Sequence, residues 1–185
     1  MEKSKKIAFL ISSLDCGGAQ RAVANLSLAI PDDWEIDIIL NNSSNVVYPY
    51  KGNLVPLGIK IPAKRDSLIY QTGMLIKRII ALKKIKKQND YLAVISFLHS
   101  ANIANIFSGN RHCKVILSVR TNISKLQGNN LKKYLMSHTV HRYYNRADRI
   151  ISLSKGVEID LVNNHGIDPN KPCPAAHTYG KVDPV

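Results

Sequence analysis

The sequence predicts an α/β fold in which helices cover both faces of a parallel sheet. Short apolar runs alternate with longer amphipathic segments along the chain, and this alternation is typical of strands joined by crossover helices. The first run, residues 7–11, is continuously apolar, as expected for a strand buried on both faces. A chain of 185 residues is long enough for one domain with a proper core and too short for two.

The expected elements follow from the same patterns. Strands are predicted at residues 7–11, 35–40, 54–57, 92–97, 114–119 and 149–153. Helices are predicted at residues 19–30, 68–88, 102–107, 130–145 and 155–164. Asp66 or Ser67 is expected to cap the second helix, and Ser154 the last. After Lys171 the sequence Pro-Cys-Pro-Ala-Ala lacks periodicity, so we expect a domain of residues 1–171 and an irregular tail of residues 172–185.

The composition points to an anionic partner. Lys and Arg number 26 against 13 Asp and Glu, which gives a formal net charge of +13. Such an excess suits nucleic acid, an anionic membrane surface or phosphorylated substrates. We expect no nucleic acid, because the sequence matches no RRM, KH or helix-turn-helix pattern and its aromatics do not interleave with the basic runs. The three scattered cysteines predict reduced thiols in a cytoplasmic protein, and no motif predicts a metal site.

A Gly-Gly turn follows the first strand. Glycines at 17 and 18 let backbone N–H groups approach a ligand closely, and the helix that follows favours negative charge at its N-terminus. Gly17 and Gly18 therefore form either a phosphate or sugar contact loop or a plain strand-to-helix turn. They are not a dinucleotide fingerprint, because the next glycine is Gly52 and the second strand ends in Asn41, not in an acidic residue.

Polar side chains follow two later strands, at the edge where parallel sheets bind ligands. His99 comes just after the strand at 92–97 and suits a hydrogen bond to a sugar hydroxyl or proton sharing near neutral pH. The alternative is a packed or helix-capping histidine. Arg120 and Asn122 follow the strand at 114–119 and suit phosphate oxygens and a sugar hydroxyl. The alternative is a pair of loop-stabilising side chains.

The helix at 68–88 combines an apolar face with basic residues. The predicted apolar face comprises Leu68, Thr72, Leu75, Ile76, Ile79, Ile80 and Leu82. Lys77, Arg78 and Lys84 are expected on the opposite side. Such a helix suits an anionic lipid surface or the pyrophosphate of a lipid-linked acceptor. The alternative is an ordinary solvated face.

Four segments, in order along the chain, resemble motifs of the family 4 glycosyltransferases of the GT-B fold. They are residues 17–26 (Gly-Gly-Ala-Gln-Arg-Ala-Val-Ala-Asn-Leu), 95–103, 118–122 and 146–156. The similarity covers about residues 5–171. It implies a Rossmann-like domain that forms the N-terminal, acceptor-binding half of a GT-B fold. In this family the donor-binding half carries an Arg, a Lys and a Glu-x7-Glu motif; we expect it after residue 171, and these 185 residues do not include it.

The resemblance also implies a reaction and its partners. A retaining, metal-independent enzyme would transfer a hexosyl group from a nucleotide sugar, its substrate, to a lipid-linked or surface-glycan acceptor, without a cofactor. His99 would be catalytic and face the donor sugar. The other implied contacts are Gly17, Gly18, Arg120 and Asn122 to the donor and its phosphates, and Lys77, Arg78 and Lys84 to the acceptor or membrane. The expected location is the inner face of the cytoplasmic membrane, as a peripheral protein. The alternative is a truncated, non-catalytic module that binds anionic lipid or lipid pyrophosphate.

Overall fold

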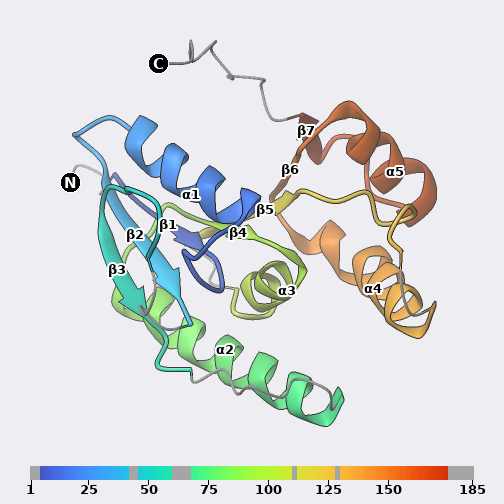
Figure 1. Ribbon diagram of the computed structural model, residues 1–185, viewed down its shortest axis with the longest axis horizontal. Coiled ribbons are helices and arrows are strands. Elements are labelled where there is room, and N and C mark those ends of the chain that lie inside the picture. The colour runs from blue at the N-terminus through green and yellow to red at the C-terminus, as the bar shows by residue number, and fades with distance from the viewer. Residues whose placement is uncertain (1–4, 42–45, 60–67, 110–111, 128–129, 175–185) are drawn as a thin grey trace.

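The computed structural model describes residues 5–41, 46–59, 68–109, 112–127 and 130–174. Within them, parallel strands form one sheet in the order β3-β2-β1-β4-β5-β6-β7 (Figure 1). The strands are β1 Lys6–Leu10, β2 Glu35–Leu40, β3 Asn53–Pro56, β4 Ala93–Phe97, β5 Lys114–Val119, β6 Arg149–Ser152 and β7 Pro172–Pro174. The helices are α1 Gly18–Ala29, α2 Leu68–Gln88, α3 His99–Phe107, α4 Asn130–Tyr143 and α5 Lys155–His165, with the 3-10 turn η1 Tyr144–Arg146.

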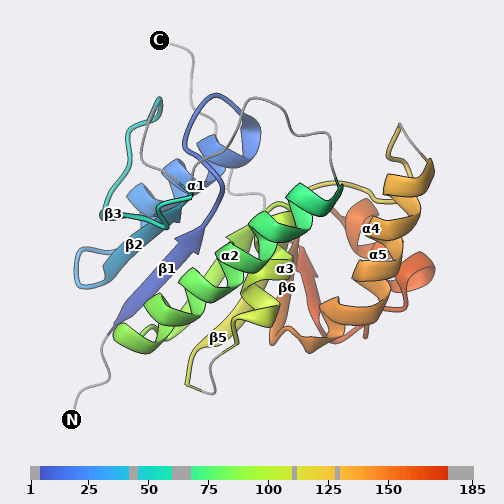
Figure 2. The same cartoon turned by 90° about the horizontal axis from the view of Figure 1, so that it is seen from below.

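Helices cover both faces of the sheet, as the sequence predicts (Figure 2). Side chains alternate between the two faces along each strand. Phe9 of β1 therefore packs toward α1, in a cluster with Val23, whereas Leu10 packs toward α2 and α3, in a cluster with Leu82 and Ala101. The chain moves from β1 outward to β2 and β3, then returns to β4 on the other side of β1. The carboxyl ends of β1 and β4 thus flank the point where the strand order reverses, which is the usual ligand crevice of such sheets.

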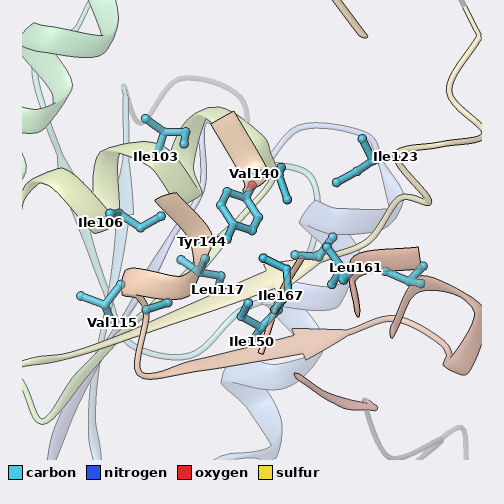
Figure 3. Close-up of a cluster of buried hydrophobic side chains, with 13 residues drawn as sticks. Ile103, Ile106, Val115, Leu117, Ile123, Val140, Tyr144, Ile150, Leu161 and Ile167 are labelled. Carbon is cyan, nitrogen blue, oxygen red and sulfur yellow. The ribbon is translucent and has the colours of Figure 1, made fainter. Parts of the chain in front are cut away.

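A third cluster of buried side chains joins α3, α4 and α5 to strands β5 and β6. Figure 3 shows the ring of Tyr144 inside this cluster, among side chains of α3, α4 and β5. Tyr144 is 1% exposed and Leu117 and Ile150 are fully buried. The cluster therefore fixes the half of the sheet that carries the β4–α3 and β5–α4 connections.

The prediction of an irregular tail is wrong for the first three residues of that tail. Pro172–Pro174 forms the edge strand β7, which pairs with β6. Proline lacks a backbone donor and is tolerated at a sheet edge. The Cys173 carbonyl also accepts a bond from Ser152 Oγ, at 3.2 Å. The sequence after Lys171 lacks a hydrophobic periodicity because this edge strand is largely exposed. Residues 175–185 and the expected caps Asp66 and Ser67 lie outside the described residues.

No helix in the described ranges is long and apolar enough to cross a bilayer. The cysteines at 16, 113 and 173 are free thiols, and the one at 113 is buried.

Candidate functional site

The Gly17–Gly18 turn forms the N-terminus of α1, at the carboxyl end of β1. Gly17 is the N-cap and no side chain caps the helix. The first amides of a helix have no intrahelical acceptor and suit an anion. The Gly17 amide already donates to the Tyr48 hydroxyl at 3.4 Å. A Cβ built on Gly18 would meet no atom within 4 Å. The protein's own packing therefore does not demand glycine at 18, and the space beside it is open to a ligand. The role of both glycines stays a prediction.

A strained backbone joins β4 to α3. Leu98, the N-cap of α3, has a φ of 74° and is the only described residue other than glycine with a positive φ. Such a conformation costs a bulky residue about 1–3 kcal/mol and is found preferentially at functional sites. No sequence pattern predicts this conformation at a leucine. Its effect is to end β4 abruptly and place His99 as the first residue of α3.

His99 is half-buried, and its Nδ1 lies 2.9 Å from the hydroxyl of Tyr144. The two rings stack with centroids 5.9 Å apart. Burial lowers the pKa of His99 to about 4, so the imidazole is neutral at pH 7. A ring with so low a pKa accepts a proton only weakly at that pH. Its contact with Tyr144 is what the alternative of a packed histidine predicts, and a hydrogen bond to a ligand stays a prediction.

Arg78 is not on the exposed face where the sequence placed it. It is 4% exposed, and its Nη1 donates to Ser12 Oγ and Ser100 Oγ, each at 3.3 Å. Ser12 follows β1 and Ser100 follows His99, so the guanidinium lies at the carboxyl ends of β1 and β4, the position that we call the crevice. Its Nε and Nη2 are buried and have no hydrogen-bond partner among the residues that the structure describes. Burial lowers its pKa to about 10, which leaves it charged at neutral pH.

The inner face of α2 follows helical spacing, and basic residues occupy two of its positions. Residues 75, 78, 79, 82, 85 and 86 face the protein. Lys86 is 1% exposed and donates to the Asn105 side chain at 2.7 Å and to its backbone carbonyl at 3.1 Å. The predicted apolar face placed Arg78 on the opposite side and did not include Lys86, so it is rotated from the observed inner face.

The α2 outer face is consequently both basic and apolar. Ile76 and Ile80, which were placed on the predicted apolar face opposite the basic residues, are 51% and 64% exposed. Lys77 and Lys84 are exposed, as predicted. We define the α2 outer face by its described exposed residues Tyr70, Ile76, Lys77, Ile80, Lys83, Lys84 and Lys87. Two of the three predicted acceptor or membrane residues therefore lie on this face, while Arg78 lies in the crevice.

Arg120 and Asn122 lie in the connection that follows β5. Arg120 is half-buried, and within the described ranges its guanidinium makes no hydrogen bond or ion pair, which leaves it available to a ligand. Asn122 Oδ1 accepts a bond from the Lys125 amide at 3.0 Å, so its carbonyl oxygen supports the loop, the alternative that the sequence left open. No interaction joins these two residues to His99.

Asp160 of α5, which the sequence analysis missed, anchors this loop. Its Oδ2 accepts bonds from the amides of Ile123 at 2.8 Å and Ser124 at 3.2 Å, and its Oδ1 accepts one from Asn164 at 2.8 Å. Burial opposes its ionisation, but the hydrogen bonds from Ser124 and Asn164 prevail and hold the pKa of Asp160 below its usual value. The residue is 38 positions from Asn122, and no sequence pattern predicts so distant a contact.

A pocket of about 500 Å³ lies at the opposite, amino-terminal edge of the sheet, lined by residues that include Cys113, Lys114 and Arg146. Ligands of parallel sheets bind at the carboxyl edge, so we place the site at the crevice of Gly18, Arg78 and His99. No cluster of His, Cys, Asp or Glu fit for a metal occurs among the described residues.

Residues 16–173 match the sequence model of the family described as Glycosyltransferase Family 4. The chain belongs to this family. The match confirms the resemblance, and the observed fold confirms the predicted Rossmann-like α/β architecture.

A curated relative from Campylobacter jejuni is 31% identical over 101 residues, which cover 55% of this chain and 28% of the relative. It is named GalNAc-alpha-(1->4)-GalNAc-alpha-(1->3)-diNAcBac-PP-undecaprenol alpha-1,4-N-acetyl-D-galactosaminyltransferase. The aligned part is thus less than a third of that enzyme.

Solved structures share the fold at low identity. The UDP-N-acetylglucosamine 2-epimerase from Rickettsia bellii matches with a TM-score of 0.63 at 8% identity, over 91% of this chain and 44% of that one. The lipopolysaccharide outer core galactosyltransferase WaaB matches with a TM-score of 0.53 at 15% identity, with the same coverage of both chains. These likenesses establish the GT-B type of Rossmann-like domain, and the chain spans less than half the length of either neighbour.

Proposed function

We propose that this chain is the acceptor-binding domain of a glycosyltransferase that moves a hexosyl group from a nucleotide sugar to a lipid-linked or surface glycan. Membership of family 4 supports the transfer chemistry. The name of the Campylobacter relative specifies an acceptor joined through PP to undecaprenol, which supports a lipid pyrophosphate as the anion that this basic chain binds.

The observation that carries the proposal is the buried guanidinium of Arg78. A buried charge with unpartnered donors is costly, and the cost needs an explanation when it falls at the ligand edge of a parallel sheet. Nε and Nη2 of Arg78 lack acceptors beside Ser12 and Ser100. The oxygens of a pyrophosphate would supply them, because a guanidinium offers parallel N–H donors that match phosphate geometry.

The donor sugar would lie against the same edge. In this proposal His99 donates a hydrogen bond to it and the Gly18 amide meets the phosphates, where Gly17 lets the backbone approach closely. Arg120 and Asn122, after β5, would contact the donor from the neighbouring strand end. The three glutamates of the chain, at positions 2, 35 and 158, form no Glu-x7-Glu motif. We propose that these residues bind and orient the substrates and are not the main source of stabilisation for the departing diphosphate.

Replacing Arg78 with methionine tests the pyrophosphate site. We expect the variant to bind inorganic pyrophosphate about tenfold to hundredfold more weakly, the equivalent of one charge-assisted hydrogen bond. Its melting temperature should change little, since an apolar side chain of similar length replaces an incompletely paired buried charge. Isothermal titration calorimetry and thermal unfolding of the 185-residue chain give both numbers.

The exposed Arg142 of α4 provides the control. Arg142→Met removes the same charge away from the crevice and should retain wild-type pyrophosphate affinity. Equal affinities in wild type and Arg78→Met would refute the site.

The α2 outer face supports a second part of the proposal, a peripheral contact with anionic membrane. Lysines on a helix face are attracted to anionic lipid, and exposed apolar side chains between them enter the headgroup region. Ile76, Ile80 and Tyr70 are exposed among the lysines of this face. Apolar side chains exposed among lysines are typical of a helix that lies on a membrane surface. The alternative, a non-catalytic module that binds anionic lipid or lipid pyrophosphate, would use the same face, and a module that binds lipid pyrophosphate would use the Arg78 site as well.

Reversing two charges on this face should weaken membrane binding. We expect Lys77→Glu combined with Lys84→Glu to bind vesicles containing phosphatidylserine at least about thirtyfold more weakly, because each basic residue near such a surface contributes about 1 kcal/mol. Co-sedimentation with vesicles of fixed composition measures the effect.

The control Arg21→Glu combined with Arg149→Glu makes the same change in net charge at exposed positions on α1 and β6. It should lower binding far less. Equal losses in the two double variants would mean that overall charge, and not the α2 outer face, attracts the chain to lipid.

A further inference from the structure

A chain of buried hydrogen bonds lies behind His99. Ser96 Oγ donates to Asn102 Oδ1 at 2.8 Å. Asn102 Nδ2 lies 3.3 Å from the Ser118 carbonyl oxygen and 3.2 Å from the Tyr144 hydroxyl. The Tyr144 hydroxyl lies 2.9 Å from His99 Nδ1. All members except His99 are at most 3% exposed, so water does not compete for these bonds.

The chemistry of the groups fixes the direction of each proton. A backbone carbonyl can only accept, so the amide nitrogen of Asn102, and not its oxygen, faces Ser118. That nitrogen carries a second proton, which it donates to the Tyr144 hydroxyl. The hydroxyl has one proton of its own, and within the described residues its other neighbour is His99 Nδ1. Donation to His99 gives this buried proton an acceptor, whereas donation from His99 Nδ1–H to Tyr144 would leave the tyrosine proton without one, at a cost.

His99 then has one possible tautomer. A neutral imidazole carries one N–H, and a nitrogen that accepts a hydrogen bond cannot be the one that carries it. Burial keeps the ring neutral by lowering its pKa to about 4. With Nδ1 accepting from Tyr144, the proton is on Nε2.

We propose that Tyr144 is a positioning residue that holds His99 as the Nε2–H tautomer, so that the ring offers a hydrogen-bond donor at the crevice. The acceptor would be an oxygen of the bound sugar, its hydroxyl or ring oxygen; this identity rests on the proposed function, whereas the tautomer does not. His99 in this form cannot accept a proton at Nε2, so it orients the sugar and does not act as a base.

The fold makes the position of this hydroxyl rigid. Tyr144 is held within the cluster of α3, α4 and β5 (Figure 3), and η1 sets its backbone. The positive φ of Leu98 sets the other partner by starting α3 at His99. Both ends of the hydrogen bond therefore belong to packed elements, as a preorganised binding group requires.

Nitrogen NMR of the labelled 185-residue chain tests the assignment directly. Long-range 15N–1H correlation spectra at pH 7 distinguish a protonated from an unprotonated ring nitrogen, and His99→Gln identifies the His99 signals. We expect Nε2 to be protonated and Nδ1 to be unprotonated. A His99 ring protonated on Nδ1 in the wild type would overturn the proposal without bearing on pyrophosphate binding by Arg78.

Tyr144→Phe removes the donating hydroxyl and preserves the ring. The preference for the Nε2–H form should fall about threefold to tenfold, the value of one hydrogen bond, and the pKa of His99 should rise because its neutral form loses a partner. Tyr143→Phe is the matched control, since Tyr143 packs by its ring edge against Phe107 and should leave the His99 spectrum unchanged. An unchanged tautomer ratio in folded Tyr144→Phe would refute the role, and if that variant does not fold, the wild-type spectrum alone decides.

Discussion

Replacing Asp160 with alanine is expected to lower the free energy of unfolding by about 3 kcal/mol, because buried hydrogen bonds to a charged acceptor contribute about 1.5–3 kcal/mol each and are not fully additive. In the variant the amides of Ile123 and Ser124 lose their acceptor. They then either stay buried without a hydrogen bond or become exposed as the loop moves. The loop that carries Asn122 should then lose its fixed position. Urea unfolding followed by circular dichroism measures the stability, and amide exchange of residues 121–125 measures the loop.

Asp168→Ala is the matched control for this change. Asp168 also accepts a backbone bond, from Asn170 at 2.9 Å, but is exposed, so its loss should cost less than about 1 kcal/mol. If both variants lose the same small amount, Asp160 does not anchor the loop in the way the structure indicates.

Acid should destabilise the chain well before its carboxylates titrate, and His99 should be a main cause. Its pKa is about 4 in the folded protein against about 6.5 in an unfolded chain. Between these values the unfolded state binds more protons, so stability rises with pH across the window. The contribution of His99 is complete above about pH 6.5 and is lost as the pH falls to 4, at most about 3 kcal/mol.

Urea unfolding at several pH values between 4 and 7 tests this expectation. His99→Gln should flatten the dependence without abolishing it, because burial also lowers the pKa of His165. His138 of α4 is exposed, so His138→Gln should retain the wild-type slope. A slope in His99→Gln as steep as in the wild type would assign the acid sensitivity to other groups.

The order of strands and helices could be predicted from sequence because local patterns determine it. A continuous apolar run, a Gly-Gly turn and a serine cap each lie within a few neighbouring residues. Ser154 does cap α5, accepting from the Val157 amide at 3.4 Å. The predicted strands at 35–40 and 114–119 coincide with β2 and β5. Family membership was also predictable, since four local motifs occur in register.

The orientation of α2 was not predictable from hydrophobicity. Arg78 and Lys86 are buried because distant residues, Ser12, Ser100 and Asn105, receive their hydrogen bonds. A prediction that places every charged residue in solvent gives the helix a wrong inner face. It also groups Arg78 with the exposed lysines. The role of Tyr144 was not predictable for the same reason, because its hydroxyl contacts His99, which lies 45 positions earlier in the sequence. Contacts of this range require the tertiary structure.

The two faces of α2 differ in the sequence changes that they can accept. Substitutions on the outer face affect only what the helix meets outside the protein. A single-residue insertion or deletion is different, because it rotates all that follows by about 100°. An insertion between Arg78 and Lys86 would leave Arg78 beside Ser12 and Ser100 and turn Lys86 away from Asn105. We therefore expect relatives that share this helix to vary freely in the composition of its exposed side and to keep its length between these two residues.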